Sequence, residues 1–295
     1  MFKFFQNLGR SLMLPVAVLP AGAIITGIGN LLNALHVLPT VAMFFSIVGT
    51  AILGQLGLIF AIGVAIGMAK KNDGAVALAG ALGYAMVTKV LNPENVATLF
   101  NIKEKAVNLG FTKMDNSNVF LGIIIGLIAA YSFNKFSEVE LPMALSFFSG
   151  KRLVPIMTVF FSTILAVILL FIWPMVFSGI VAFGEWLVGF GSFGAFLYGV
   201  FNRLLIPTGL HHALNAVFWF DTAGINDIGK FQTGVDAVKG ITGRYQAGFF
   251  PIMMFGIPAA ALAMYHSAET KQQKQVWGWF LASAISAFVV GVTEP

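Results

Sequence analysis

The residues best able to do chemistry in this 295-residue chain gather in one stretch, residues 202–215. An otherwise apolar sequence there carries a guanidinium, two imidazoles and an amide, from Arg203, His211, His212 and Asn215. A proline and a glycine between the arginine and the histidines prevent one continuous helix. A broken helix at membrane depth persists only where it is buried in protein or lines a wet cavity, and ionisable groups there predict a functional site. The alternative is an ordinary loop at a membrane surface, with the Arg203 side chain reaching out to water.

A second chemical group closes the chain, where Thr293 and Glu294 follow an apolar run. Pro295 disfavours helix at the residue before it, so we expect the Glu294 carboxylate at a helix break, at membrane depth. A carboxylate accepts hydrogen bonds, a guanidinium offers five donors, and an imidazole can do both. Sugar hydroxyls also donate and accept, so this mixture suits a sugar. We expect no metal site, because adjacent histidines such as His211 and His212 point in different directions on a helix.

The composition decides which elements must position these groups. The chain is 58% hydrophobic and only 10% charged, with a mean hydropathy of +0.88. A soluble domain is usually about 25% charged, so an all-α polytopic membrane protein is predicted. The formal charge of +5 then reflects loop lysines and arginines that fix topology, and no nucleic-acid partner is expected. The chain has no cysteine, which excludes a disulfide, a thiolate metal site and a cysteine nucleophile within it.

The N-terminus allows two interpretations. Residues 1–25 combine a short basic start, an apolar run and small residues, which is typical of a signal peptide. The alternative, which we favour, is an interfacial helix that leads into a first span. Prolines at positions 15 and 20 interrupt the apolar run, and the same composition continues through the rest of the chain.

Spans of about 20 apolar residues are expected at eight positions. They are residues 12–35, 41–68, 75–91, 119–133, 154–177, 180–200, 248–265 and 276–292. Residues 204–220 form a ninth, broken segment that either crosses the membrane or re-enters it. Two polar connections, residues 92–118 and 221–247, are expected in water. Gly122 and Gly126 have the spacing of a helix-packing pair, which is common in membrane helices and by itself predicts little.

Loop charge predicts a cytoplasmic N-terminus, because short cytoplasmic loops carry an excess of lysine and arginine. The connections 33–40 and 178–179, which would then lie outside, carry none, whereas three lysines in residues 92–118 oppose this orientation. Lys151 belongs to a basic pair before a span and either anchors that span or has a functional role. The residues that would lie inside are Lys3, Arg10, Lys70, Lys71, Lys135, Lys151 and Arg152.

Five segments spread over the chain resemble one family. They are Gly-Arg-Ser-Leu-Met-Leu-Pro at 9–15 and on to position 20, and the segments 58–65, 147–155, 203–211 and 291–295. Together they resemble the membrane-embedded IIC component of bacterial phosphotransferase-system (PTS) sugar permeases, in the glucose and N-acetylglucosamine branch. Residues 205–210 and 248–265 are most similar to the N-acetylglucosamine permeases. Glucose-type members more often have Phe where Thr208 stands.

The resemblance implies a mechanism and its residues. Such a permease binds sugar within the membrane, carries it inward by an elevator-like movement, and has it phosphorylated at the 6-hydroxyl. The donor is a phosphocysteine on a IIB domain, which is reached through IIA, HPr and enzyme I, and no cofactor is required. The resemblance makes the chain the membrane component of a protein-phosphocysteine–sugar phosphotransferase. It assigns sugar binding to Lys151, Arg203, His211 and Glu294, with Glu294 and His211 polarising the 6-hydroxyl. His212, Asn215 and Thr293 complete the predicted site, and either His212 or Asn215 would serve an acetamido group.

The resemblance also implies an organisation. Residues 1–175 would form a scaffold and the interface of a homodimer in the bacterial inner membrane. Residues 176–295 would form an incomplete sugar-carrying part, because family members continue beyond the motif that ends at Pro295, and no IIA or IIB domain is present. We therefore expect a fragment or a truncated gene product. N-acetylglucosamine members usually have Gln where His212 stands, and residues 221–244 are shortened, which leaves glucose, glucosamine or maltose open as substrates.

Two other classes of protein share part of this pattern. Membrane His, Glu and Arg residues also build proton relays, so a secondary transporter or channel without phosphorylation is one alternative. A transport-dead membrane sensor is the other, and it is favoured if the chain truly ends at Pro295. A IIB domain with its reactive cysteine, encoded downstream or in a neighbouring gene, would favour the phosphotransferase.

Overall fold

The computed structural model describes residues 4, 7–8, 10–12, 15, 18–205, 214–215, 218–219, 227, 230–231, 236–270 and 277–290. All regular structure in these ranges is helical, which confirms the predicted all-α class. The chain divides into two compact units, and each is described by itself below. Unit 1 comprises Met1–Pro15, Gly54–Gly184 and Leu205–Leu214. Unit 2 comprises Val16–Leu53, Glu185–Leu204 and Asn215–Pro295.

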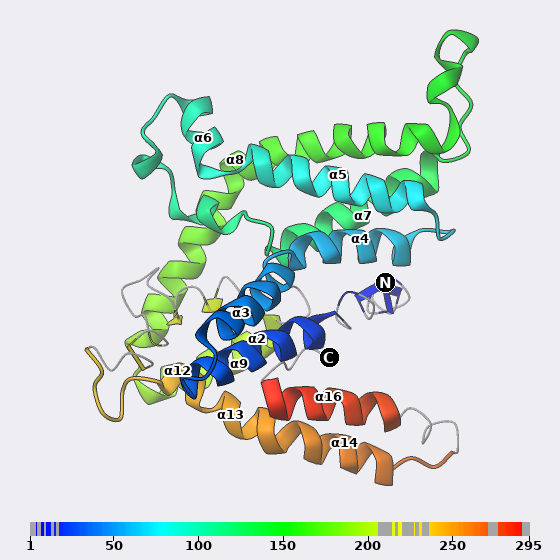
Figure 1. Cartoon of the computed structure of the whole chain (residues 1–295). Helices are drawn as coiled ribbons and strands as arrows, with labels where there is room; N and C mark the ends of the chain where they lie inside the picture. Colours follow the sequence, from blue (N-terminus) through cyan, green and yellow to red (C-terminus); the bar gives the residue numbers. More distant parts are fainter. Residues whose placement is uncertain are drawn as a thin grey trace. The chain divides into compact units, whose positions relative to one another are not determined.

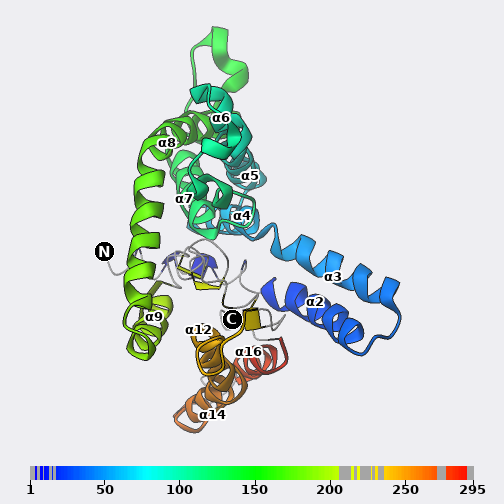
Figure 2. The ribbon, with the colours of Figure 1, turned by 90° about the vertical axis from the view of Figure 1, so that its left-hand side faces the viewer.

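Unit 1 is built on three helices that pack side by side: α4 (Leu56–Met68), α5 (Gly74–Val90) and α7 (Val119–Phe136) (Figures 1 and 2). Small residues let α4 and α7 approach closely. A Cβ atom added at Gly126 would lie 2.7 Å from Val64 Cβ and 2.8 Å from the Ala61 carbonyl oxygen. The glycine spacing noted in the sequence therefore marks a real helix–helix contact, of the kind that small residues make in membrane proteins.

The polar connection between α5 and α7 folds into short helices. They are α6 (Pro93–Phe100), η1 (Glu104–Ala106) and η2 (Leu109–Lys113), and α6 lies at 58° to α5. Buried polar groups fasten this connection to the helices. The Trp173 indole N–H donates to the Gly110 carbonyl oxygen at 2.8 Å, and the Tyr84 hydroxyl donates to the Asp115 carbonyl oxygen at 2.9 Å. The connection is thus an ordered cap on unit 1.

The next helix, α8, corrects one prediction. It runs without a break over Leu153–Val188, so the predicted connection at residues 178–179 is wrong. Pro174 lies inside this helix. Proline is tolerated in membrane helices because neighbouring groups and local adjustments satisfy the freed carbonyl. The next helix, α9, begins only at Ser192, after a turn. Two short 3₁₀ helices, η3 (Met143–Phe148) and η4 (Gly150–Arg152), precede α8.

Unit 2 begins with a helical hairpin of α2 (Leu19–Ala34) and α3 (Pro39–Leu53). Glycines again set the packing, since a Cβ atom at Gly29 would lie 2.6 Å from the Ser46 backbone nitrogen. The predicted span 41–68 is interrupted, because α3 ends at Leu53 and α4 begins at Leu56.

The rest of unit 2 holds α9 (Ser192–Leu205) and a helical run near the C-terminus. That run comprises α12 (Arg244–Ala247), α13 (Phe249–Pro251), the π-helix η7 (Ile252–Gly256) and α14 (Ile257–His266). The last described helix, α16 (Trp277–Val290), packs against α14. A π-helical turn is rare and is often found at functional sites.

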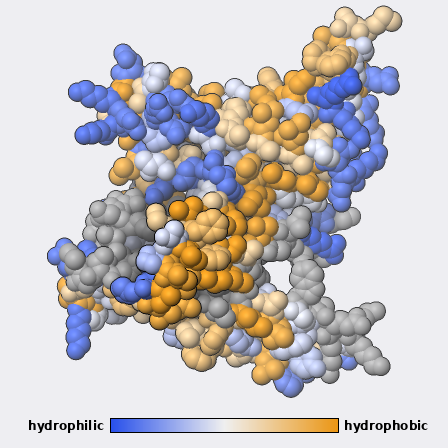
Figure 3. All heavy atoms as spheres, in the orientation of Figure 1, coloured by the Kyte–Doolittle hydropathy of each residue, from blue (hydrophilic) through white to orange (hydrophobic). Residues whose placement is uncertain are grey.

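Length and composition support a multi-pass membrane protein. Within the described ranges, three helices are long and apolar enough to cross a membrane, or up to five if each bent helix pair forms one span. Figure 3 shows hydrophilic side chains of unit 1 over the α6 region and over the opposite ends of α4 and α5, with hydrophobic side chains between them. This is the distribution expected of helices whose ends meet water and whose middles meet lipid.

Candidate functional site

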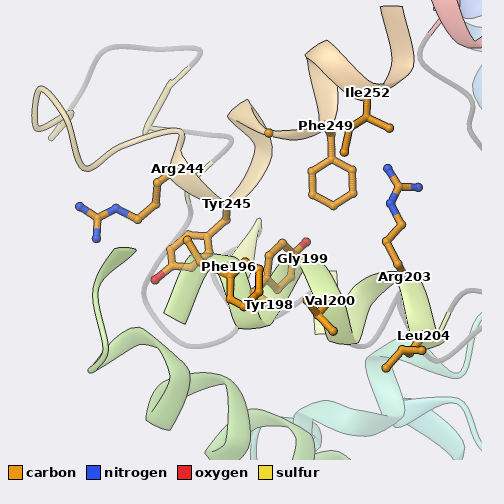
Figure 4. A pocket seen from close by; sticks show the side chains of 12 residues that line it. Phe196, Tyr198, Gly199, Val200, Arg203, Leu204, Arg244, Tyr245, Phe249 and Ile252 are labelled. Carbon is orange, nitrogen blue, oxygen red and sulfur yellow. The ribbon is translucent and has the colours of Figure 1, made fainter. Parts of the chain in front are cut away.

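The best-defined part of the site surrounds Arg203, in the last turn of α9. Its guanidinium carbon lies 4.8 Å from the centre of the Phe249 ring, on α13, which is a cation–π arrangement. Figure 4 shows Arg203, Phe249 and Ile252 at one end of a cavity of about 530 Å³ between α9 and residues 244–252. Val200 and Phe196 extend its apolar wall. This volume is within the range of small-molecule sites, and the predicted arginine is one of its few polar groups.

Asn215, another predicted site residue, is engaged by the protein itself. Its side-chain carbonyl oxygen accepts hydrogen bonds from the Tyr198 hydroxyl, at 2.7 Å, and from the side-chain amide of Asn202. Tyr198 and Asn202 lie on α9, so Asn215 is tied to the helix that carries Arg203. This contact was not predicted, although a tyrosine and an asparagine four residues apart share one face of a helix.

An aromatic cluster supports the wall of the cavity. The Tyr198 ring centre lies 4.5 Å from that of Phe218, 5.6 Å from that of Tyr245 and 6.2 Å from that of Phe249. Such edge-on and tilted pairs contribute about 0.5–1.5 kcal/mol each beyond area burial. The cluster therefore fixes Phe249, the ring under the guanidinium, relative to α9.

A buried carboxylate fixes the backbone beside Tyr245, which lines the same cavity. Asp227 accepts hydrogen bonds from the backbone N–H groups of Gly243, at 2.6 Å, and Tyr245, at 3.1 Å. The Trp219 indole N–H donates to the Tyr245 carbonyl oxygen at 3.3 Å. Both backbone groups of Tyr245 are thus satisfied by side chains. Asp227 was not predicted as a site residue, because an aspartate in a polar connection resembles any other in sequence.

Lys151, the predicted cation of unit 1, forms an ion pair. Its ammonium lies 2.6 Å from a carboxylate oxygen of Asp73, and its side chain is 66% exposed. Asp73 caps the N-terminus of α5 by accepting from the Ala75 N–H. The hydrogen bond from Lys151, followed by that from Ala75, lowers the pKa of Asp73 below its ordinary value. A second ion pair joins Lys71 to Glu138 at 3.1 Å.

The remaining predicted residues, His211, His212, Thr293 and Glu294, lie outside the described residues. Their roles stay predictions. In the part of the chain that the structure describes, no three His, Asp or Glu side chains gather as a metal site would require.

Comparison with known proteins gives a consistent result. Residues 9–295 match the family described as "Phosphotransferase system, EIIC". The chain is 44% identical over 295 residues to the "PTS system N-acetylglucosamine-specific EIICB component" of Bacillus subtilis (strain 168), covering all of this chain and 60% of the relative. It is 44% identical over 306 residues to the "PTS system N-acetylglucosamine-specific EIICBA component" of Escherichia coli (strain K12), covering 99% of this chain and 42% of the relative.

A shorter relative matches over more of its own length. The "PTS system N-acetylglucosamine-specific EIIC component" of Streptomyces coelicolor is 41% identical over 310 residues, which cover all of this chain and 72% of that protein. A "PTS system glucose-specific EIICBA component" of Staphylococcus saprophyticus is 39% identical over 321 residues, covering all of this chain and 47% of the relative. The chain thus spans 60% or less of the Bacillus and Escherichia relatives.

Proposed function

Because the chain belongs to the phosphotransferase system EIIC family, we propose that it is the membrane permease of a sugar phosphotransferase system. It binds N-acetylglucosamine within the inner membrane and carries it to the cytoplasmic side, where the sugar receives a phosphoryl group. The observation that carries this proposal is the match over the whole chain to relatives named as N-acetylglucosamine-specific.

The cavity beside Arg203 supports the choice of an acetylated sugar. An acetamido group needs a small apolar recess for its methyl and a hydrogen-bonding partner for its amide. Val200, Phe249 and Ile252 line such a recess, and Arg203 supplies donors at its edge. The sugar hydroxyls would bind Arg203, His211 and Glu294, and the acetamido amide would bind His212 or Asn215. Glucose remains the second candidate, since a glucose-specific relative is 39% identical.

The proposed reaction transfers a phosphoryl group from a phosphocysteine on a IIB domain to the sugar. The sulfur–phosphorus bond breaks and releases the cysteine thiolate, a bond from phosphorus to O6 forms, and the 6-hydroxyl gives its proton to the positioned base Glu294. Glu294 and His211 orient and polarise that hydroxyl. Lys151 and Thr293 contact the sugar in the loaded state. The IIB domain receives its phosphoryl group through enzyme I, HPr and IIA.

The proposed organisation follows the resemblance. Residues 1–175 form a scaffold and the interface of a homodimer, and residues 176–295 belong to the sugar-carrying part. The N-terminus faces the cytoplasm. These assignments place the proposed phosphorylation on the side where Lys70, Lys71 and Lys151 lie.

The test uses membranes that contain the complete gene product, phosphorylated IIB in excess, and labelled N-acetylglucosamine. The expected product is the 6-phosphate. The Glu294→Gln variant should form it ~10²–10⁴-fold more slowly, the usual contribution of a positioned base, while sugar binding falls less. Accumulation of unmodified sugar in response to an ion gradient would instead favour a secondary transporter.

A further inference from the structure

Three polar side chains of unit 2 are buried together in apolar surroundings. Tyr198 is 1% exposed, Asn202 2% and Asn215 7%. Burying such groups is costly unless they are hydrogen-bonded. The carbonyl oxygen of Asn215 accepts from both other side chains, and the Asn202 amide also lies 3.4 Å from the Tyr198 hydroxyl. An amide oxygen has two lone pairs, so these two donors fill the acceptor capacity of the Asn215 oxygen, whereas its NH2 group takes no part in these bonds.

These three residues connect the two ends of the stretch that carries the predicted chemistry. Tyr198 and Asn202 lie one turn apart on α9, and Arg203 directly follows Asn202. Asn215 lies on the other side of residues 206–213, which include His211. The hydrogen bonds therefore hold the start and the end of this stretch together.

Tyr198 also connects these hydrogen bonds to the wall of the cavity. Its ring contacts Tyr245 and Phe249, and the Phe249 ring lies under the Arg203 guanidinium. Tyr198, a residue of α9, therefore contacts Asn215 through its hydroxyl and α13 through its ring.

We infer that Tyr198, Asn202 and Asn215 form a positioning clamp, which sets the geometry of Arg203 at the cavity that Tyr198 also lines, and which holds the start and the end of the stretch 202–215 together. This inference rests on the proposed function, and it adds a positioning role to the predicted sugar contact of Asn215. Misplacement of a reacting group by about 1 Å can lower a rate ~10²-fold. We expect Tyr198→Phe and Asn202→Ala each to lower kcat/KM for N-acetylglucosamine phosphorylation by ~10–100-fold.

A double-mutant cycle separates positioning from general destabilisation. Residues of one network have non-additive effects, so the double variant Tyr198→Phe with Asn202→Ala should be little worse than either single variant. In an Arg203→Lys background, Tyr198→Phe should have a much smaller effect than in the parent. The control is Tyr131→Phe, which removes an exposed hydroxyl in unit 1 that accepts from Lys135. Either an unchanged kcat/KM per folded protein in the single variants, or fully additive losses in the double variant, would overturn the inference.

A second measurement is independent of sugar chemistry. The chain contains no cysteine, so Thr208→Cys introduces a single thiol between the clamped ends. Its rate of modification by a maleimide should rise severalfold when Tyr198→Phe or Asn202→Ala is added, and stay constant with Tyr131→Phe. An unchanged rate would show that the clamp does not restrain this segment. If the parent protein phosphorylates no N-acetylglucosamine, the proposed function fails, but the thiol experiment still decides whether the clamp exists.

Discussion

Replacing Arg203 by lysine tests the best-defined part of the site. Lysine keeps the positive charge and loses the flat fork of donors, so a site that needs only charge would tolerate the change. Arg203 lines the cavity with its guanidinium carbon 4.8 Å from the Phe249 ring centre, and this stacking restricts the orientation of the fork. Lysine cannot reproduce that orientation, since its ammonium is a point charge on a flexible stem.

The magnitude follows from the contacts. A hydrogen bond to a charged group contributes about 1.5–3 kcal/mol, and each 1.4 kcal/mol changes affinity about tenfold. Arg203→Lys should therefore raise the Kd for N-acetylglucosamine by about 10- to 150-fold. Phe249→Leu keeps the guanidinium and removes the ring beneath it. Since a cation–π contact contributes about 0.5–2 kcal/mol, this variant should raise the Kd by only about 2- to 30-fold.

Equilibrium dialysis of the purified gene product with labelled sugar measures both values. Arg152→Lys is a matched control, because the Arg152 guanidinium also lies over a ring, that of Phe147, at 4.6 Å, but in the η3–η4 region of unit 1. Its Kd should equal that of the parent. Sugar binding by Arg203→Lys within twofold of the parent, with an unchanged melting temperature, would refute the assignment of Arg203 to the sugar.

Three further predictions concern unit 1. Gly126→Leu overpacks the α4–α7 contact and should therefore lower the free energy of unfolding by about 1–3 kcal/mol. The control Gly179→Leu, which has nothing within 4 Å of its added Cβ, should melt like the parent. Equal melting temperatures of the two variants would contradict this prediction. Asp73→Asn retains the helix cap and loses the ion pair with Lys151. The folded-state pKa of Asp73 is lowered, so the Asp73 carboxylate stabilises the fold above its unfolded-state pKa of about 4, and this stabilisation is lost as pH falls through the folded-state pKa. The Asp73→Asn variant should therefore melt at a lower temperature than the parent at neutral pH, and the two melting temperatures should converge below about pH 4. Trp173→Phe leaves the buried Gly110 carbonyl without its donor and should lower the free energy of unfolding by about 1–3 kcal/mol, as measured by denaturant titration. An unchanged midpoint of that titration would show that water replaces the indole.

Much of the helical framework could be predicted from hydropathy alone. The helices α5 and α7 closely match the predicted spans 75–91 and 119–133. The errors arose where small residues look alike in sequence. Ser178 and Gly179 resemble a turn, yet α8 continues through them, because an apolar environment favours helix wherever the backbone would otherwise lack partners.

The site divides in the same way. Arg203 could be singled out as a candidate, because an arginine in an apolar segment is costly and therefore informative, and the structure places it at a cavity, while its contact with sugar stays a prediction. The clamp could not be predicted, since Tyr198 and Asn202 are ordinary residues of an apolar helix in sequence, and their role depends on the contact with Asn215. The contact of Asn215 with α9 depends on the tertiary fold and not on spacing along the chain. For the same reason the ion pair between Lys151 and Asp73 emerges only from the packing of unit 1.

We propose that the complete gene product, together with phosphorylated IIB, phosphorylates N-acetylglucosamine. The most direct measurement is competition between sugars, in membranes that contain the complete gene product and phosphorylated IIB. A site that hydrogen-bonds a substrate group rejects an analogue lacking it by up to ~10⁴-fold, because its own polar groups are left unpaired. Equimolar unlabelled glucose should therefore leave formation of labelled N-acetylglucosamine 6-phosphate almost unchanged. If glucose suppresses that product as strongly as unlabelled N-acetylglucosamine does, the substrate assignment is wrong.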